Sequence, residues 1–260
     1  MLKPFNKDID GFENEDEFVF YLNNRKVGNL NPLFDDLFTY LFGLVNPDSM
    51  ISCMKSFEKQ KADIIVKIGN TEKRISIKKG IKNSVHAEKF ESFILFLRSI
   101  GFGDPIIREI CLFHYGDGTL DGTGVKRISS LEYKECHQDK LDMINFYFNQ
   151  EEVIRKCVKR FVLQGNNSDK EIDAIIYGTV DDFIWASSSE VMDAIIRNKD
   201  IKRTGLGFGS LFYQPFNRCL NYNKKYEDKR NYIQIKWYHL VDDLIWAMNE
   251  RYKKSHVLSN

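Results

Sequence analysis

The sequence lacks any apolar run that approaches the roughly 20 residues of a membrane-spanning helix. Its first six residues, Met-Leu-Lys-Pro-Phe-Asn, also lack the apolar stretch of a signal peptide. Internal repeats and low-complexity linkers are absent as well. We therefore expect a cytoplasmic protein without a membrane partner, folded as a single domain over residues 1–260.

Closely spaced cysteine pairs are also absent. The cysteines are odd in number, lie far apart and form no Cys-x-x-Cys motif: Cys53, Cys111, Cys136, Cys157 and Cys219. Disulfide frameworks and zinc sites need paired or clustered cysteines. We expect reduced thiols that are mostly buried.

The sequence has almost no net charge, because 38 basic residues oppose 37 acidic ones. An evenly spread charge of this size would argue against a nucleic-acid-binding protein. The charges are segregated, however: residues 8–17 hold six acids and no base, residues 73–89 hold six Lys or Arg and one acid, and residues 197–236 hold ten Lys or Arg and three acids. Local basic surface of this kind is what phosphate recognition requires.

Residues 61–80 predict two strands joined by a Gly-Asn turn. Asp63 enters the first strand, and Ser76 and Lys78 alternate with two isoleucines in the second. Because side chains alternate faces along a strand, the isoleucines can enter a core while Ser76 and Lys78 point toward Asp63. A carboxylate and an amine at one edge suit metal-assisted phosphodiester hydrolysis. Hairpins with a surface Asp, Ser and Lys are also common in proteins without a catalytic site.

This pattern resembles the PD-(D/E)XK nuclease superfamily, in which an acidic residue opens one strand and an acid-x-Lys triplet lies on the next. The close match covers about twenty residues, and Ala62 and Ser76 stand where the family has proline and an acid. A subset of type II restriction endonucleases also carries Ser-x-Lys and takes the missing carboxylate from the following helix. The resemblance implies that Asp63 binds Mg²⁺, that Lys78 orients or activates the attacking water, and that Ser76 supports them by hydrogen bonding.

Glu88 and Glu91 lie where that subset has its replacement carboxylate. We expect a helix over residues 84–100, on which these two glutamates share one face because they are three residues apart. The resemblance implies that Glu91 or Glu88 is a catalytic metal ligand. It also implies a metal-binding glutamate on an N-terminal helix, for which Glu17 is the candidate. The acids near Glu17 equally suit the first turn of a helix, where they complement its dipole.

Basic and polar residues follow Lys78 and flank the expected start of this helix. Helix N-termini favour anions through their free N–H groups and their dipole. We expect phosphate contacts from Lys79, Lys82, Ser84 and His86. His86 could instead be a surface or helix-capping residue.

Residues 208–237 interleave basic, aromatic and amide side chains. Lys and Arg bind phosphates, while Gln, Asn and Arg read base edges. This pattern loosely resembles C-terminal strands of bacterial type II restriction endonucleases. It predicts a basic C-terminal β-hairpin that contacts DNA. The alternative is an exposed polar hairpin whose aromatic side chains pack inward. The candidate DNA-binding residues are Gln214, Asn217, Arg218, Lys224, Lys225, Arg230 and Gln234.

Two further acidic features are weaker candidates. Residues 117–123 repeat Asp-Gly-Thr and could bind a cation, but the spacing fits no EF-hand loop and acidic turns are ordinary surface connectors. Asp173 resembles Asp63 in its position, yet no x-Lys triplet follows it. We interpret it as a strand-entry aspartate.

The remaining pattern predicts an α/β fold with a mixed central β-sheet flanked by helices, like that of restriction endonucleases, around one continuous core. We expect N-terminal helices within residues 12–60, at about 15–23, 31–43 and after Pro47. The catalytic hairpin and its helix then follow at 61–101, a helical segment at 105–165, and C-terminal strands with the DNA-contacting hairpin at 170–240.

These features predict a Mg²⁺-dependent endonuclease acting on double-stranded DNA, specifically a sequence-specific type II restriction enzyme without an organic cofactor. Cleavage of both strands of a symmetric site favours a homodimer. Two alternatives stay open. One is a repair or recombination nuclease that reads DNA structure, and the other is a DNA-binding protein whose active site has decayed at Ser76.

Overall fold

The computed structural model describes residues 11–56, 61–80, 84–165, 168–216 and 224–258. The chain forms two compact units. Unit 1 comprises Met1–Asn83, Val162–Ala194 and His239–Asn260, and unit 2 comprises Ser84–Phe161 and Ile195–Tyr238. The single domain and the one continuous core that the sequence predicts both stay predictions.

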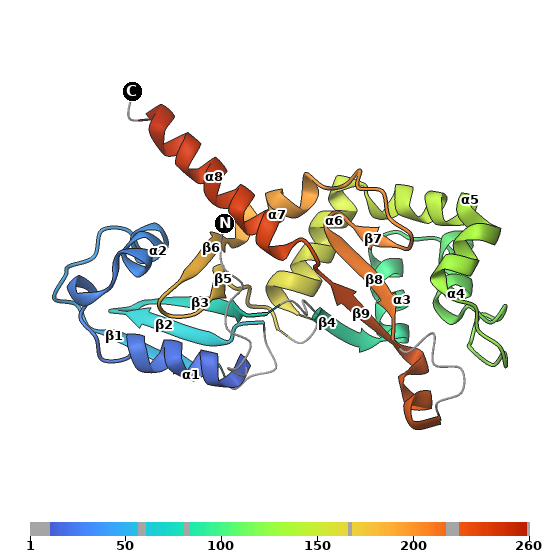
Figure 1. Ribbon diagram of the computed structural model, residues 1–260, viewed down its shortest axis with the longest axis horizontal. Coiled ribbons are helices and arrows are strands. Elements are labelled where there is room, and N and C mark those ends of the chain that lie inside the picture. The colour runs from blue at the N-terminus through green and yellow to red at the C-terminus, as the bar shows by residue number, and fades with distance from the viewer. Residues whose placement is uncertain (1–10, 57–60, 81–83, 166–167, 217–223, 259–260) are drawn as a thin grey trace. The chain divides into compact units, whose positions relative to one another are not determined.

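Unit 1 contains a five-stranded mixed sheet in the order β1-β2-β3-β5-β6 (Figure 1). Its strands are β1 (Ile51–Lys55), β2 (Ile64–Ile68), β3 (Thr71–Lys78), β5 (Ala174–Gly178) and β6 (Phe183–Ser187). All neighbours are antiparallel except β3 and β5, which are parallel. The mixed sheet that the sequence predicts is therefore confirmed.

The turn between β2 and β3 has only two residues, because Ile68 and Thr71 are register partners. Gly69 adopts a φ of +56° there, which glycine tolerates without steric cost and which two-residue hairpin turns require. The predicted Gly-Asn turn is confirmed. It fixes the register that later sets Asp63 beside Ser76.

Helices pack on this sheet and supply aromatic side chains to its core. Helix α1 (Gly11–Leu22) packs against β1, and α8 (Leu240–Leu258) packs against β6 (Figure 1). Helix α2 (Pro32–Phe42) begins with proline after Asn31, whose side chain accepts a hydrogen bond from Phe34 N–H. Phe18 of α1 and Phe34 of α2 are fully buried in one cluster with the strand residues. A 3₁₀ turn, η1 (Val27–Asn29), separates the two helices.

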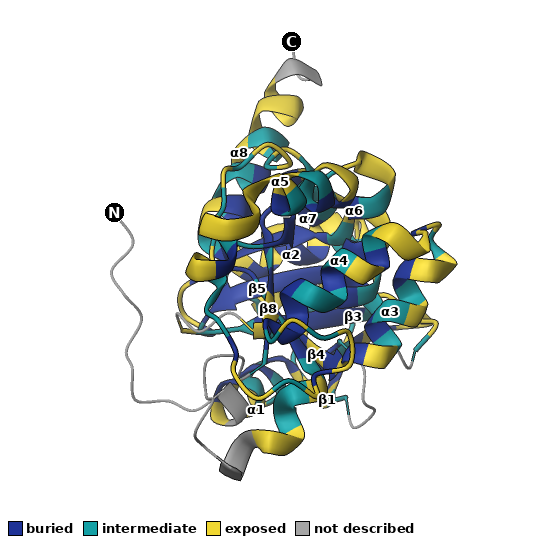
Figure 2. Cartoon of the chain, turned by 90° about the vertical axis from the view of Figure 1, so that its right-hand side faces the viewer, coloured by how far each residue is buried: buried dark blue, intermediate teal, exposed yellow. Residues whose placement is uncertain are grey.

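Unit 2 contains a second, antiparallel sheet in the order β4-β9-β8-β7. Its strands are β4 (Ser84–Lys89), β7 (Gly207–Phe208), β8 (Leu211–Pro215) and β9 (Tyr232–Lys236). Its helices are α3 (Phe90–Ser99), α4 (Asp104–Tyr115), α5 (Ser130–Phe148) and α6 (Glu151–Val158). The segments η2 (Lys159–Gln164) and α7 (Ser188–Ile196) continue from one unit into the other. Figure 2 shows buried residues along the strands and the inward sides of the helices.

Two helix predictions are wrong. Residues 84–89 form strand β4 rather than the first turns of a helix, because they pair with β9 about 150 residues later in the chain. The helix expected after Pro47 is absent among the described residues of that segment, where a turn leads into β1. The helical segment predicted at 105–165 is confirmed, although it is divided into α4, α5, α6 and η2.

The described cysteines Cys53, Cys111, Cys136 and Cys157 are free, and Cys219 lies outside the described residues. Cys53 and Cys157 are buried, which raises the pKa of the Cys53 thiol to about 12 and that of Cys157 well above its usual value. In the part of the chain that the structure describes, no helix is both long and apolar enough to span a membrane.

Candidate functional site

Asp63, Ser76 and Lys78 lie together at one end of the β2–β3 hairpin in unit 1. The backbone N–H of Asp63 donates to the carbonyl of Ile75 at 2.9 Å, at the end of the β2–β3 ladder, where Ile75 is the register partner of Ile64. The hydroxyl of Ser76, the next residue of β3, reaches the Asp63 carboxylate. Strand alternation accounts for the rest: Ile75 and Ile77 enter the core, while Ser76 and Lys78 face Asp63.

The Asp63 carboxylate has two unlike oxygens. Oδ2 accepts hydrogen bonds from Ser76 Oγ at 2.9 Å, from the backbone N–H of Ile77 at 2.6 Å and from Lys78 Nζ at 3.1 Å. Among the described residues, none donates to Oδ1. Three donors on Oδ2 hold the carboxylate in one orientation, and Oδ1 is left to bind a further partner.

Ser76 and Lys78 differ in their access to solvent. Ser76 is buried, with 2% of its surface exposed, so its hydroxyl acts on Asp63 and not on solvent. The Lys78 side chain is 32% exposed, and its Nζ also donates to the Ile77 carbonyl at 3.2 Å. Lys78 can therefore reach a ligand at the edge of the sheet while it stays tied to Asp63.

Glu15 of α1 is a site residue that the sequence did not predict. Burial, and next the negative charge of Asp63, raise the pKa of the Glu15 carboxyl, so the two carboxylates are electrostatic neighbours. The Glu15 side chain is 20% exposed, and its Oε2 lies 3.7 Å from Lys55 Nζ. By contrast, Glu17, the predicted metal ligand, is exposed to solvent.

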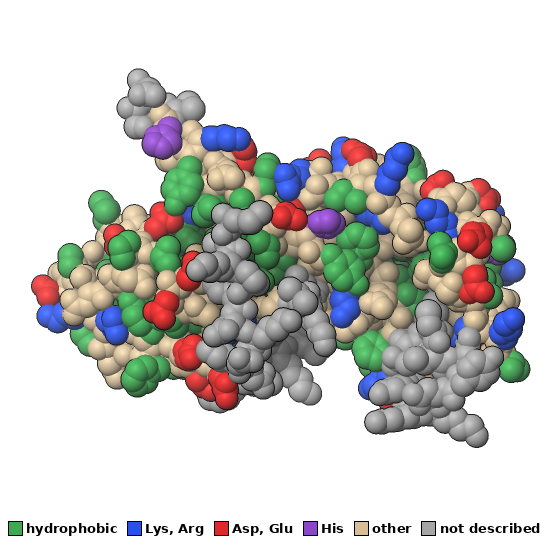
Figure 3. All heavy atoms as spheres, viewed as in Figure 1, with side chains coloured by type: hydrophobic (Ala, Val, Ile, Leu, Met, Phe, Trp, Pro, Cys, Tyr) green, Lys and Arg blue, Asp and Glu red, His purple; other side chains and the backbone are tan. Residues whose placement is uncertain are grey.

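Helical spacing explains why Glu15, and not Glu17, approaches the sheet. Among the side chains of α1 whose burial is described, Asn14, Phe18 and Leu22 are buried, and they recur every four positions. Glu15 precedes Phe18 by three residues and Leu22 by seven, which places it on the border of that buried face. Glu17 lies farther round the helix and is exposed. Figure 3 shows acidic side chains near α1. The period of the buried face was the signal that could have identified Glu15.

Oxygen ligands dominate this site. Asp63 and Glu15 supply two carboxylates, and Mg²⁺ typically binds one or two carboxylates and keeps several waters. Among the described residues, no group of three or more His, Cys, Asp or Glu side chains could hold a metal ion. Asp63 Oδ1 and the Glu15 carboxylate are oxygen donors of the kind that suits a hard divalent cation with several retained waters.

Glu88, one of the two glutamates predicted to replace the missing ligand, is engaged within unit 2. It lies in β4 with 5% of its surface exposed. Arg160 donates two hydrogen bonds to its carboxylate, from Nη2 at 2.6 Å and from Nε at 3.3 Å. His86 Nε2 lies 3.5 Å from its Oε1. Burial opposes the charged form, but hydrogen bonds from His86 and Arg160 prevail and lower the pKa of Glu88. Its carboxylate already has cationic partners, so its role as a metal ligand stays a prediction without support.

Glu91, the other candidate, lies in the first turn of α3 and is exposed. It does not share a helical face with Glu88, because Glu88 belongs to a strand. Asp63 belongs to unit 1 and Glu91 to unit 2. Metal binding by Glu91 stays a prediction.

The predicted DNA-binding residues have different environments. Gln214 of β8 and Gln234 of β9 are directly opposite each other and lie outside the buried face of their sheet. Arg230 instead binds the Gly122 carbonyl at 2.6 Å and Glu227 at 3.0 Å, which anchors the loop of residues 116–124. His86 is buried and packs on Phe161, so the predicted phosphate contact has no support.

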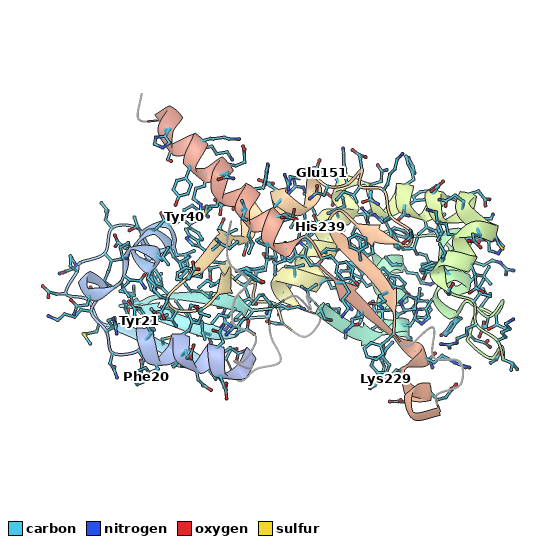
Figure 4. All side chains as sticks on the ribbon, viewed as in Figure 1. Phe20, Tyr21, Tyr40, Glu151, Lys229 and His239 are labelled. Atoms are coloured by element: carbon cyan, nitrogen blue, oxygen red, sulfur yellow. The ribbon has the colours of Figure 1, made fainter. Side chains whose placement is uncertain are left out.

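The other predicted contacts are described only in part. Ser84 is exposed in β4 and pairs in register with Lys236. Lys79 Nζ is buried without a hydrogen-bond partner among the described residues. Lys224 and Lys225 begin η3 (Lys224–Asn231), near the labelled Lys229 in Figure 4. Lys82, Asn217 and Arg218 lie outside the described residues.

The two weaker acidic candidates are satisfied by protein groups. Asp117 accepts hydrogen bonds from Thr119 and Gly124, and Asp121 accepts them from Thr123. These are turn-forming contacts of the loop itself. Asp173 binds Lys73 Nζ at 3.0 Å and the Arg74 N–H at 2.8 Å, which agrees with a strand-entry role.

A hollow of about 690 Å³ in unit 2 was not predicted from the sequence. It lies between α5 and residues 199–203. Its walls mix lysines, amides and carboxylates, and Arg203 lies among them with a pKa lowered to about 10 by burial. None of the predicted site residues lines it.

The fold is similar to that of a solved structure, the restriction endonuclease MspI in complex with its cognate DNA. The match has a TM-score of 0.54 at 15% sequence identity and covers 87% of this chain and 91% of the MspI chain. No family model and no curated protein matches the sequence. At this identity the comparison shows the fold alone, and the chain therefore has the restriction-endonuclease-like α/β fold that the sequence predicts.

Proposed function

We propose that this protein is a Mg²⁺-dependent DNA endonuclease whose active site comprises Asp63, Lys78 and Glu15. The observation that carries the proposal is the asymmetry of the Asp63 carboxylate, whose Oδ2 is held by three donors while Oδ1 accepts no hydrogen bond from the described residues. Glu15, an electrostatic neighbour of Asp63, supplies a second carboxylate. A fixed carboxylate, a second carboxylate and a part-exposed lysine are the groups that metal-assisted phosphodiester hydrolysis uses. The restriction-endonuclease-like fold supports the same reaction class.

Each residue has a defined task in this reaction. Asp63 Oδ1 and Glu15 would hold the cation, which supplies Lewis-acid activation of the phosphate and of a bound water. Ser76 and the Ile77 N–H keep Asp63 oriented, since both donate to Oδ2. Lys78 Nζ, 3.1 Å from Oδ2, orients the attacking water and offsets the negative charge that develops on the phosphate. Glu91 stays a candidate for a further ligand.

Double-stranded DNA is the proposed substrate, and sequence-specific type II cleavage is the proposed mode. MspI, the structural neighbour, was solved with its cognate DNA. On this chain, the facing amides of Gln214 and Gln234 form a pair that can hydrogen-bond to base edges, as glutamine does to adenine. Cutting both strands of a symmetric site favours a homodimer, which we include in the proposal.

A second candidate function is a DNA-binding protein with a decayed active site. The observation that favours it is Ser76, which is buried and supplies a hydroxyl where the resembled family has an acid. Two carboxylates in place of three would then bind metal too weakly for catalysis. The two functions differ in whether DNA is cut or only retained.

Incubation of the protein with long unmodified DNA, with Mg²⁺ and again with EDTA, separates these possibilities. Discrete fragments that require Mg²⁺ support the type II restriction enzyme. Smearing or structure-dependent nicking indicates a repair or recombination nuclease instead. Retention of DNA in a mobility-shift assay without cleavage indicates the decayed protein, and neither retention nor cleavage contradicts the whole proposal.

A further inference from the structure

Lys55 is a second cation at the candidate site, and the sequence did not single it out. It ends β1, and its register partner Ile64 directly follows Asp63. A backbone hydrogen bond of 2.9 Å from Ser56 N–H to the Asp63 carbonyl fixes this end of β1 to the start of β2. Lys55 thus lies at the end of β1 that adjoins Asp63.

The Lys55 ammonium lies between two acids of α1. Its Nζ is 2.9 Å from Asp16 Oδ1 and 3.7 Å from Glu15 Oε2. The Asp16 side chain is 67% exposed, whereas those of Lys55 and Glu15 are 23% and 20% exposed. Asp16 is the stronger partner of Lys55, since its hydrogen bond and its charge raise the pKa of Lys55 more than Glu15 does. Glu15 is the less exposed of the two partners, so water screens its contact with Lys55 less.

The charges around Glu15 show what Lys55 does there. The negative charges of Asp63 and Asp16 raise the pKa of Glu15, and the positive charges of Lys55 and Lys78 lower it. Lys78 is already hydrogen-bonded to Asp63, which leaves Lys55 as the nearer cation of Glu15. Burial of two neighbouring carboxylates is costly unless a positive charge offsets their repulsion.

We propose that Lys55 is a positioning residue that serves as the internal counter-ion of Glu15. When a divalent cation binds, it replaces Lys55 in this role. This proposal rests on the proposed function, because it assigns Glu15 to the metal site. Lys55 holds the Glu15 side chain near Asp63 in the metal-free enzyme. The same contact competes with the divalent cation, since both draw on one carboxylate.

If Lys55 competes with the divalent cation, removal of the Lys55 charge should strengthen cation binding. Calcium serves as the probe because it commonly binds such oxygen sites, and its affinity is measured by isothermal titration calorimetry without DNA. Lys55→Met should bind Ca²⁺ at least about fivefold more tightly than wild type, which is the effect of one unit charge at about 4 Å even under full screening by water. Lys26→Met is the matched control, since Lys26 pairs with Asp48 in unit 1 on an exposed surface.

Two further variants separate competition from a purely structural role. Lys55→Arg keeps the positive charge, so its Ca²⁺ affinity should stay near that of wild type. In the background of Glu15→Gln, Lys55→Met should give no gain, because the carboxylate that Lys55 offsets is gone. Lys55→Gln provides the same comparison should Lys55→Met prove unstable by thermal unfolding.

The failures of the two proposals are distinguishable. If wild type binds Ca²⁺ and Lys55→Met binds it equally or less tightly, the counter-ion role is refuted while the metal site stands. If wild type binds neither Ca²⁺ nor Mg²⁺, the proposed function fails and the role of Lys55 fails with it. A gain that persists in the Glu15→Gln background also refutes the role, because the effect would not act through Glu15.

Discussion

Asp63 shows how the environment of one residue divides the tasks within a single carboxylate. Its Oδ2 is saturated by Ser76, Ile77 and Lys78, and its Oδ1 accepts nothing from the described residues. A carboxylate with one oxygen held by donors and the other oxygen open is preorganised for a ligand, because it need not rearrange when the ligand binds. The serine that replaces an acid in the resembled pattern thus keeps a function: it orients Asp63.

Replacement of Lys78 tests the residue that faces the reacting groups. Lys78→Met should lower Mg²⁺-dependent cleavage by about 10² to 10⁴, the usual effect of losing one positioned proton-transfer group. Ca²⁺-supported DNA binding should change little, since the lysine acts on the water more than on the duplex. The matched control is Lys67→Met, an exposed lysine in β2 of the same sheet. Near-normal cleavage by Lys78→Met would remove Lys78 from the mechanism.

Glu88 gives a prediction about stability rather than catalysis. Its pKa is lowered in the folded state, so its contribution to stability is present at neutral pH and is lost as pH falls below about 4.5 and through the folded pKa. Glu88→Gln should cost about 3 kcal/mol at pH 7, because it leaves Arg160 without its anionic partner. Urea unfolding at pH 7 and at pH 3 measures this. The cost should shrink at pH 3, and a cost that does not change with pH would contradict the ion-pair role.

The elements show which parts of the site were accessible from the sequence. Strand alternation and a two-residue turn are local, and they were sufficient to bring Asp63, Ser76 and Lys78 together. Strand β4 was missed because its structure depends on pairing with β9, which no local pattern reveals. Glu15 was missed because Glu17, next to the buried Phe18, was preferred over the residue that the helical period favours.

Helix α1 provides a comparison of two glutamates on one element. Glu15→Gln should weaken Ca²⁺ binding by about tenfold or more, since affinity at such sites follows the number of charged ligands. Glu17→Gln, an identical change two residues away on the exposed side, should leave it unchanged. Calorimetric titration of both variants measures this. The reverse pattern would return the metal ligand to Glu17, as the sequence predicted.

Strands β8 and β9 provide a test of base recognition. Gln214→Ala and Gln234→Ala should each reduce discrimination between related DNA sites by about 1 to 3 kcal/mol if each amide makes a bidentate base contact. Gln138→Ala, in α5 of the same unit, is the control. Competition binding with single-base variants of the site gives the values. Uniform loss of affinity for all sequences would mean that these residues do not read bases.

At the scale of the whole molecule, the sequence predicts the fold class but not the complete set of sheets. The mixed sheet and its helices follow from residue patterns, and the similarity to MspI extends over 87% of the chain. The second, antiparallel sheet was not predicted beyond a C-terminal hairpin, because it joins segments from residues 84–89 and 207–236. Unit 1 holds Asp63, Glu15, Lys55 and Lys78, so the proposed chemistry can be tested by variants of one unit.

The most direct test of the proposed site is cleavage of one long DNA by wild type and by Asp63→Asn under the same Mg²⁺ concentration. The change keeps the shape of the side chain but replaces the charged Oδ1 or Oδ2, and circular dichroism checks that the fold is retained. We expect wild type to produce Mg²⁺-dependent fragments. Asp63→Asn should cleave at least about 10³-fold more slowly, because metal activation contributes several kcal/mol to lowering the barrier. Cleavage by folded Asp63→Asn at the wild-type rate would contradict the account.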